Sequence, residues 1–99
     1  MKTVFIVNHS GQHSYEAAKE KGELVYLTRG FIDIANDLKS IVHSIESLIA
    51  TSEPEDYLLL SGNGLLCVMA FDLWKRKHGK VTVLHTINSG RSYTEHEFN

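Results

Sequence analysis

Short apolar runs alternate with longer stretches of helical periodicity along the 99-residue chain. The runs at 3–7 and 57–60 are almost continuously apolar, which is typical of strands covered on both faces of a parallel sheet. Runs at 24–28 and 80–86 add two further predicted strands. Residues 92–98 could return as an antiparallel edge strand, because their polar and apolar side chains divide between two faces.

Helical patterns separate these strands. A short helix is predicted over 15–21. Asp33 is a candidate N-cap for a long amphipathic helix, which Pro54 ends because proline disfavours helical geometry in the residue before it. A third helix begins near Asn63, and Gly79 suits its C-terminal stop.

The third helix is apolar over an unusually wide arc. Cys67, Phe71 and Trp74 extend its apolar side well beyond one stripe. A helix of this kind is buried on two sides, so either the C-terminal segment or a second copy of the chain must cover it. We expect a homodimer with these three residues in its interface, since two-fold dimers are the commonest assemblies.

Strands that alternate with helices predict an α/β fold within a single domain, residues 1–99. We expect a three-layer, Rossmann-like (flavodoxin-like) sandwich with a parallel sheet in the order 2-1-3-4 and a possible antiparallel C-terminal edge strand. The order changes direction between the first and third strands, and a crevice opens there at the carboxyl ends. The fold resembles small ligand-sensing domains, including some that bind nucleotides as dimers.

Small polar residues follow the predicted strands at their carboxyl ends, where Asn8, Thr28, Ser61 and Thr86 are expected to share one rim. The opposite edge carries charges typical of a solvated surface, such as Asp56 and Lys80. This asymmetry predicts a binding site at the carboxyl ends. The candidate ligand-binding residues are Asn8, His9, Ser10, Gly11, His13, Arg29, Ser61, Gly62, Asn63, Gly64 and His85.

The segment Ser61–Gly64 joins a predicted strand to a predicted helix. Its glycines allow a ligand to approach the backbone, and free N–H groups at a helix start attract anions. The segment lacks the ending of a Walker loop, and Cys67 stands where a dinucleotide fingerprint has its third glycine. We therefore predict docking of a small anionic or nucleotide-like molecule, with a simple tight turn as the alternative.

The histidines near this rim offer three further interpretations. His9, His13 and His85 could contact a polar ligand, act as acid or base, or ligate a metal, and simple loop or capping roles are the alternative. No carboxylate or thiolate accompanies them in their loops, so we predict neither a metal site nor another cofactor. Arg29 has a planar guanidinium that would suit a phosphate or carboxylate, and a plain surface arginine is the alternative.

Composition narrows the class of protein. A formal net charge of −2 gives no support for nucleic-acid binding, and the single cysteine excludes an internal disulfide. No apolar run approaches the roughly 18 residues that a membrane helix needs. We expect a soluble, cytoplasmic protein without a membrane partner.

Three functions remain open. The first is a dimeric domain, without catalysis, that binds an anionic, nucleotide-like molecule at the carboxyl ends of its strands. The second is a protein-interaction or assembly module that acts through the apolar third helix. The third is a small hydrolase or phosphotransfer enzyme using His9 or His13, which has the least support because no complete catalytic constellation is visible.

Overall fold

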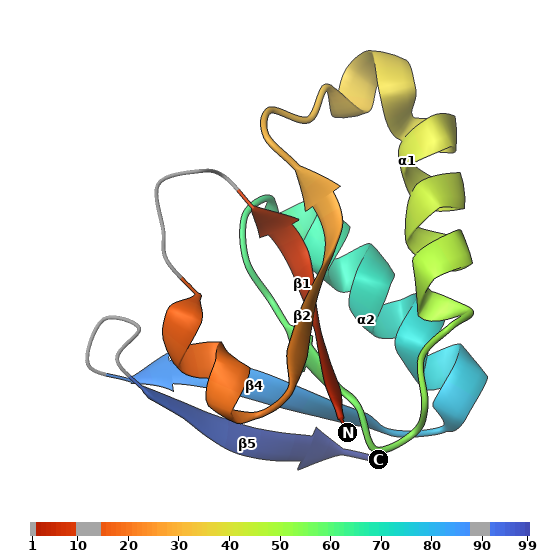
Figure 1. Cartoon of the computed structure of the whole chain (residues 1–99). Coiled ribbons are helices and arrows are strands. Elements are labelled where there is room, and N and C mark those ends of the chain that lie inside the picture. The colour runs from red at the N-terminus through yellow and green to blue at the C-terminus, as the bar shows by residue number, and fades with distance from the viewer. Residues whose placement is uncertain (1, 10–14, 88–91) are drawn as a thin grey trace.

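The computed structural model describes residues 2–9, 15–87 and 92–99. Its elements, in chain order, are β1 (Thr3–His9), the 3-10 helix η1 (Glu16–Glu20), β2 (Glu23–Arg29), α1 (Ile34–Ile49), β3 (Tyr57–Leu59), α2 (Gly64–His78), β4 (Val81–Ile87) and β5 (Ser92–Phe98). The strands form one five-stranded sheet in the order β2-β1-β3-β4-β5 (Figure 1). Strand β5 is antiparallel to β4, and the other pairs are parallel. The predicted strand order and the antiparallel edge strand are confirmed.

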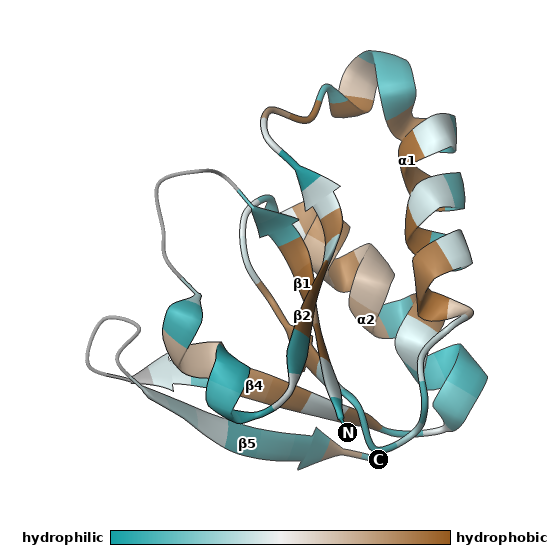
Figure 2. Cartoon of the chain, viewed as in Figure 1, coloured by the Kyte–Doolittle hydropathy of each residue, from teal (hydrophilic) through white to brown (hydrophobic). Residues whose placement is uncertain are grey.

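Both α-helices lie on the same face of the sheet (Figure 1), and the larger part of the core fills the space between them and the strands. Trp74 of α2 is fully buried there, with its ring 5.3 Å from that of Phe5 in β1. Along α1, the buried residues Ile41, Ile45 and Ile49 recur every four positions. The other side of α1 is mostly hydrophilic (Figure 2), so this helix is amphipathic as predicted.

The second face of the sheet has a much thinner cover. Tyr15 and Ala18, in and beside η1, pack there against Val4 and Ile6 of β1. Because η1 has only five residues in 3-10 geometry, it cannot cover the width that a full helix would. The predicted short helix is therefore this 3-10 turn, and the structure is a mixed α/β fold in which a three-layer, Rossmann-like sandwich is not confirmed.

The helix ends follow from local sequence chemistry. Asp33 caps α1 by accepting a hydrogen bond from the backbone N–H of Asn36 at 3.3 Å. Asn63 caps α2, and its side-chain oxygen accepts from the N–H groups of two first-turn residues. Gly79 ends α2 with a φ of +78°, a left-handed conformation that glycine adopts at little cost. The caps at Asp33 and Gly79 and the start of the third helix near Asn63 were predicted from the sequence and are confirmed.

The C-terminal ends of the two helices are tied together. The Lys77 ammonium donates to the backbone carbonyls of Ile49, Ala50 and Ser52 at 2.6–3.0 Å, where α1 leaves carbonyl groups without helical partners. Nε2 of His78 lies 2.8 Å from the hydroxyl of Ser52. These contacts join the C-terminal end of α2 to the segment that follows α1.

Candidate functional site

Three of the predicted rim residues meet at the carboxyl ends of β1, β2 and β3. The Ser61 hydroxyl donates to the carbonyl of Asn8 at 2.8 Å, and the Thr28 hydroxyl donates to the Asn8 side-chain oxygen at 2.9 Å. The Asn8 amide donates to the carbonyl of Gly30 at 3.3 Å. Thr86, exposed on β4, makes no hydrogen bond to these residues within the described part of the chain. The polar groups of Asn8 and Ser61 thus join the strand ends to one another.

The glycine turn above this network packs closely against the chain itself. Gly62 has a φ of +80°, and a Cβ added there would lie 2.8 Å from the Cβ of Asn8. Asn63 already accepts hydrogen bonds from the backbone N–H groups of Leu65 and Leu66. The turn therefore satisfies its own packing and capping needs. This arrangement agrees with the tight-turn interpretation and leaves only Gly64 beside open space.

A small aromatic and cationic cluster occupies the other side of the rim. The ring of half-buried His9 meets Tyr26 edge-on at 4.8 Å and Tyr15 at 5.9 Å. The guanidinium of Arg29 lies over the Tyr26 ring at 4.5 Å and is exposed. Within the described ranges, Arg29 makes no ion pair and the His9 imidazole makes no hydrogen bond. An anion could therefore reach Arg29, whereas the part of the chain that the structure describes places no nucleophile or acid in hydrogen-bonding contact with the His9 ring.

Of the predicted ligand contacts not yet placed, the structure describes only His85. Ser10, Gly11 and His13 lie outside the described residues. His85 belongs to the β4–β5 hairpin, where its ring is 6.0 Å from that of His96. Among the residues that the structure describes, no group of three or more histidine, cysteine, aspartate or glutamate side chains could hold a metal ion.

An apolar surface lies along α2, and of its side chains the sequence analysis selected only Phe71. We call this surface the α2 patch; its residues are Leu60, Leu65, Val68, Phe71 and Phe98. Val68 is 66% exposed, Leu65 49% and Phe98 48%, and the rings of Phe71 and Phe98 lie 5.7 Å apart. Isolated exposed apolar residues are ordinary, but a contiguous group on one surface is typical of an interaction site.

A groove of about 440 Å³ runs along the α2 patch. It is lined by Leu60, Cys67, Val68, Phe71, Asp72 and Lys75. Cys67 is half-buried and donates weakly to the carbonyl of Ser61 at 3.4 Å. Burial raises the pKa of the Cys67 thiol, so the thiol stays protonated and unreactive at neutral pH.

The predicted interface contained one residue that the structure assigns elsewhere. Trp74 has no exposed surface, because it faces the sheet and packs on Phe5. Trp74 therefore belongs to the core and has no surface that a partner could contact. Of the three predicted interface residues, Cys67 and Phe71 are the ones that lie at the groove.

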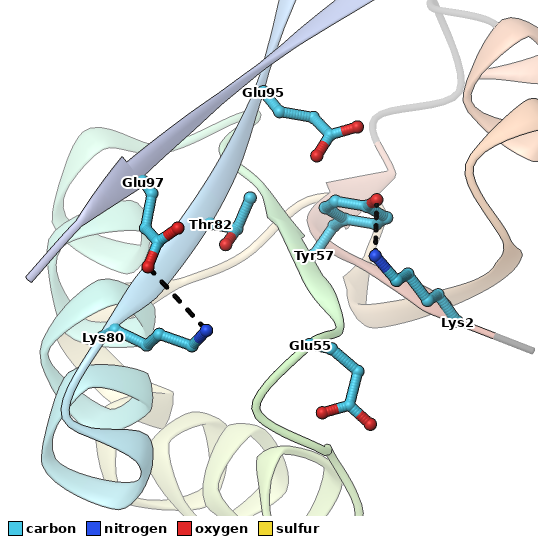
Figure 3. Close-up of a pocket in the computed structure, with 7 residues that line it drawn as sticks. All are labelled: Lys2, Glu55, Tyr57, Lys80, Thr82, Glu95 and Glu97. Atoms are coloured by element: carbon cyan, nitrogen blue, oxygen red, sulfur yellow. Dashed lines mark hydrogen bonds and ion pairs between the residues drawn. The ribbon is translucent and has the colours of Figure 1, made fainter.

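A second hollow, of about 350 Å³, lies on the face of the sheet opposite the helices. We call it the charged basin; it is lined by Lys2, Glu55, Tyr57, Lys80, Thr82, Glu95 and Glu97 (Figure 3). The ammonium of Lys2 donates to the hydroxyl of Tyr57 at 3.2 Å, and this hydrogen bond raises the pKa of Lys2. Lys80 lies 3.7 Å from the carboxylate of Glu97.

The remaining interactions around the charged basin are also internal to the chain. Lys21, next to η1, donates to Glu95 of β5 at 3.0 Å, and this bond lowers the pKa of Glu95. Asp56, predicted to be a solvated charge, is instead buried, and its carboxylate accepts the N–H groups of Thr3 and Glu53. These contacts tie β5 and the loop before β3 to the rest of the sheet, so most of the charge here is already neutralised.

The fold and surfaces together define a mixed α/β domain with one five-stranded sheet, two helices on one face and an exposed apolar patch on the second helix. No helix in the described ranges is long and apolar enough to cross a membrane. A family model described as "Phage Pam3 gp32-like protein" matches residues 2–99, so the chain belongs to that family. Comparison with curated proteins and with solved structures finds no match.

Proposed function

We propose that the chain is a protein-interaction module without catalytic activity that associates through the α2 patch. The observation that carries this proposal is the exposure of three apolar side chains at or near the groove: Val68 lines it, Leu65 precedes Val68 by one helical turn, and Phe98 packs on Phe71 of its lining. Burial of apolar surface is the main driving force of association, at roughly 25 cal/mol per Å². These side chains contribute no burial free energy while they face water, and a bound partner would remove them from water.

The proposal fits the rest of the molecule. The polar groups of Asn8, Ser61 and Asn63 are used within the chain, so they offer little to a nucleotide. Among the described residues the His9 side chain makes ring contacts with Tyr15 and Tyr26, and these give no support to acid–base catalysis. The α2 groove, by contrast, combines an apolar lining with charged groups at Asp72 and Lys75, the composition that recognition sites usually show.

Photocrosslinking tests the proposal where the natural partners are present. A photoreactive benzoylphenylalanine is placed at position 68, and the chain is irradiated in the cells that naturally produce it. We expect a specific adduct that added wild-type chain suppresses and added Val68→Glu chain does not. The matched control carries the same group at position 38, because Leu38 is an exposed apolar residue of α1 outside the α2 patch. Equal adducts at both positions, or none at position 68, would contradict the proposal.

A second candidate function is binding of a small anion beside Arg29. Its support is the exposed guanidinium of Arg29, which stacks over the Tyr26 ring. No carboxylate among the described residues forms an ion pair with it. The probes are inorganic phosphate and adenosine monophosphate in a thermal unfolding assay. A ligand at a hundred times its Kd adds about 2.7 kcal/mol to the free energy of unfolding.

The Arg29→Gln variant should lose any rise in melting temperature that these probes cause. Arg76→Gln is the matched control, because Arg76 is another exposed arginine, already paired with Asp72 at 2.9 Å on α2. No rise with either probe in the wild-type chain would remove this candidate. A rise that survives in Arg29→Gln would place the anion elsewhere.

A further inference from the structure

We infer that His85 of β4 and His96 of β5 form a binding site for a divalent transition metal that prefers imidazole ligands, such as Zn²⁺. In the sequence, His85 has no ligand beside it in its own loop, whereas the fold places a second histidine next to it on the neighbouring strand. The site uses none of the residues of the α2 patch, so this inference and the proposed function are independent of each other.

Strand pairing brings the two histidines to one face of the sheet. In the antiparallel register, His85 lies opposite Thr94 and His96 lies opposite Val83. The two histidines are therefore diagonal neighbours, a position from which aromatic side chains reach each other across a strand pair. Val83 faces the core under the helices, and residues two apart on a strand share a face. Both histidines consequently belong to the face of the sheet that carries the helices.

The spacing of the two rings suits a shared metal ion. Their centroids lie 6.0 Å apart, their planes are inclined at 75°, and both side chains are exposed. With metal–nitrogen bonds of about 2.0–2.1 Å, two imidazole centroids on one tetrahedral ion lie roughly 5 Å apart. Small rotations of exposed side chains are fast and would close the remaining difference without a change in the backbone.

Thr94 holds one of the rings in the form that a metal requires. Its hydroxyl donates to the carbonyl of His85 at 3.5 Å and lies 2.9 Å from Nε2 of His96. Because the hydroxyl proton is directed to that carbonyl, the oxygen accepts from a protonated Nε2, and Nδ1 of His96 keeps its lone pair. Histidines that ligate a metal donate their other ring N–H in this way, which fixes the tautomer and the direction of the ring. A plain contact between two rings needs no such hydrogen bond.

The ligand atoms determine the class of metal. Imidazole nitrogens suit Zn²⁺, Cu²⁺ or Ni²⁺, whereas Mg²⁺ and Ca²⁺ prefer oxygen ligands. The carboxylates of β5 do not supply such oxygens, because Glu95 and Glu97 lie on the opposite face at the charged basin (Figure 3). Among the described residues, the two histidines are the ligands, and the other coordination positions are left to water or to a ligand from outside the chain.

Isothermal titration calorimetry with zinc chloride tests the site in the purified chain. We expect the wild type to bind one Zn²⁺ per chain, with an affinity that falls at least tenfold in His85→Gln and in His96→Gln. His43→Gln is the matched control and should bind as the wild type does, because His43 is an exposed histidine of α1 without a histidine partner in the described residues. No binding by the wild type, or equal affinity in all three variants, would overturn the site.

A further variant tests the orientation of the His96 ring. Thr94→Val keeps the branched shape but removes the hydroxyl, and we expect the zinc affinity to fall about tenfold, the lower end for loss of an orienting partner. Because Thr94 and both histidines are exposed, each variant should melt like the wild type without metal. Unchanged zinc affinity in Thr94→Val would contradict the role of its hydroxyl. Magnesium chloride that binds as tightly as zinc chloride would contradict the class of metal.

Discussion

The side chain of Asn8 lies directly against Gly62, so closely that a Cβ on Gly62 would come within 2.8 Å of the Cβ of Asn8. Atoms of that kind do not approach so closely, and the backbone at Gly62 is left-handed with a φ of +80°. Glycine is therefore required there for packing and conformation. The same features in the sequence had suggested close approach of a ligand.

Replacing Gly62 by alanine should destabilise the chain even in the absence of any ligand. Strain at a left-handed position costs of order 1–3 kcal/mol, and the contact with Asn8 adds to it. Urea unfolding monitored by Trp74 fluorescence would measure the loss. Gly64→Ala is the matched control, because a Cβ there meets nothing within 4 Å and lies in the first turn of α2. Gly64→Ala should leave the free energy of unfolding unchanged or raise it. Equal losses of stability in the two variants would contradict the requirement for glycine at position 62.

Removing the cap of α2 should also weaken the fold. Asn63→Ala deletes the oxygen that accepts the N–H groups of Leu65 and Leu66, and loss of such a cap costs about 0.5–2 kcal/mol. Asn63→Asp keeps the hydrogen-bond acceptor and adds a negative charge at the helix N-terminus, so this variant should be at least as stable as the wild type. The midpoint of urea unfolding measures both. An alanine variant as stable as the wild type would show that solvent replaces the cap.

The positions of the strands and the helix ends were predictable from the sequence because they depend on local patterns, and the strand order was predictable because alternating strands and helices form only a few parallel topologies. A continuous apolar run identifies β1 and β3, and an asparagine or aspartate before a helical pattern identifies each N-cap. The short 3-10 helix was predicted as an ordinary helix, since periodicity over so few residues cannot distinguish the two. The thin cover of the second face follows from that difference and could not be anticipated.

The candidate surfaces were harder to predict, because burial is a property of the assembled chain. Trp74 and Val68 both belong to the apolar arc of α2, yet the first faces Phe5 and the second faces solvent. Nothing in the helical pattern says which side the sheet covers. The charged basin combines residues from separate segments, such as Lys2 and Glu97, and no spacing in the sequence relates them.

Lys77 should contribute to stability far more than its neighbour Lys75. Its ammonium donates to the carbonyls of Ile49, Ala50 and Ser52, whereas Lys75 makes no hydrogen bond within the described residues. Lys77→Met keeps most of the side-chain volume and removes those bonds. Because the site is partly solvated, we expect a loss of about 1.5 kcal/mol in the free energy of unfolding, the lower end of the range for hydrogen bonds to a charged group. Lys75→Met, measured in the same urea titration, should change little; the reverse ranking would contradict the assignment.

His78 should make stability depend on pH in mildly acidic solution. Burial, and secondly the neighbouring Lys77, lower its pKa in the folded chain from the ordinary value of 6.5. The unfolded chain therefore takes up a proton at a pH where the folded chain does not, and protonation favours unfolding. The contribution of His78 to the free energy of unfolding is complete above pH 6.5 and decreases below that pH. It stops decreasing once the pH falls below the pKa of His78 in the folded chain.

The comparison of wild type with His78→Gln isolates this effect from other titrating groups. The glutamine amide can still donate to the Ser52 hydroxyl but carries no ionisable proton. Below pH 6.5 the free energy of unfolding of the wild type should therefore fall more steeply than that of His78→Gln, while above that pH the two curves should run parallel. Curves that stay parallel down to the acid unfolding of both chains would show that the His78 imidazole has the same proton affinity in the folded and unfolded states.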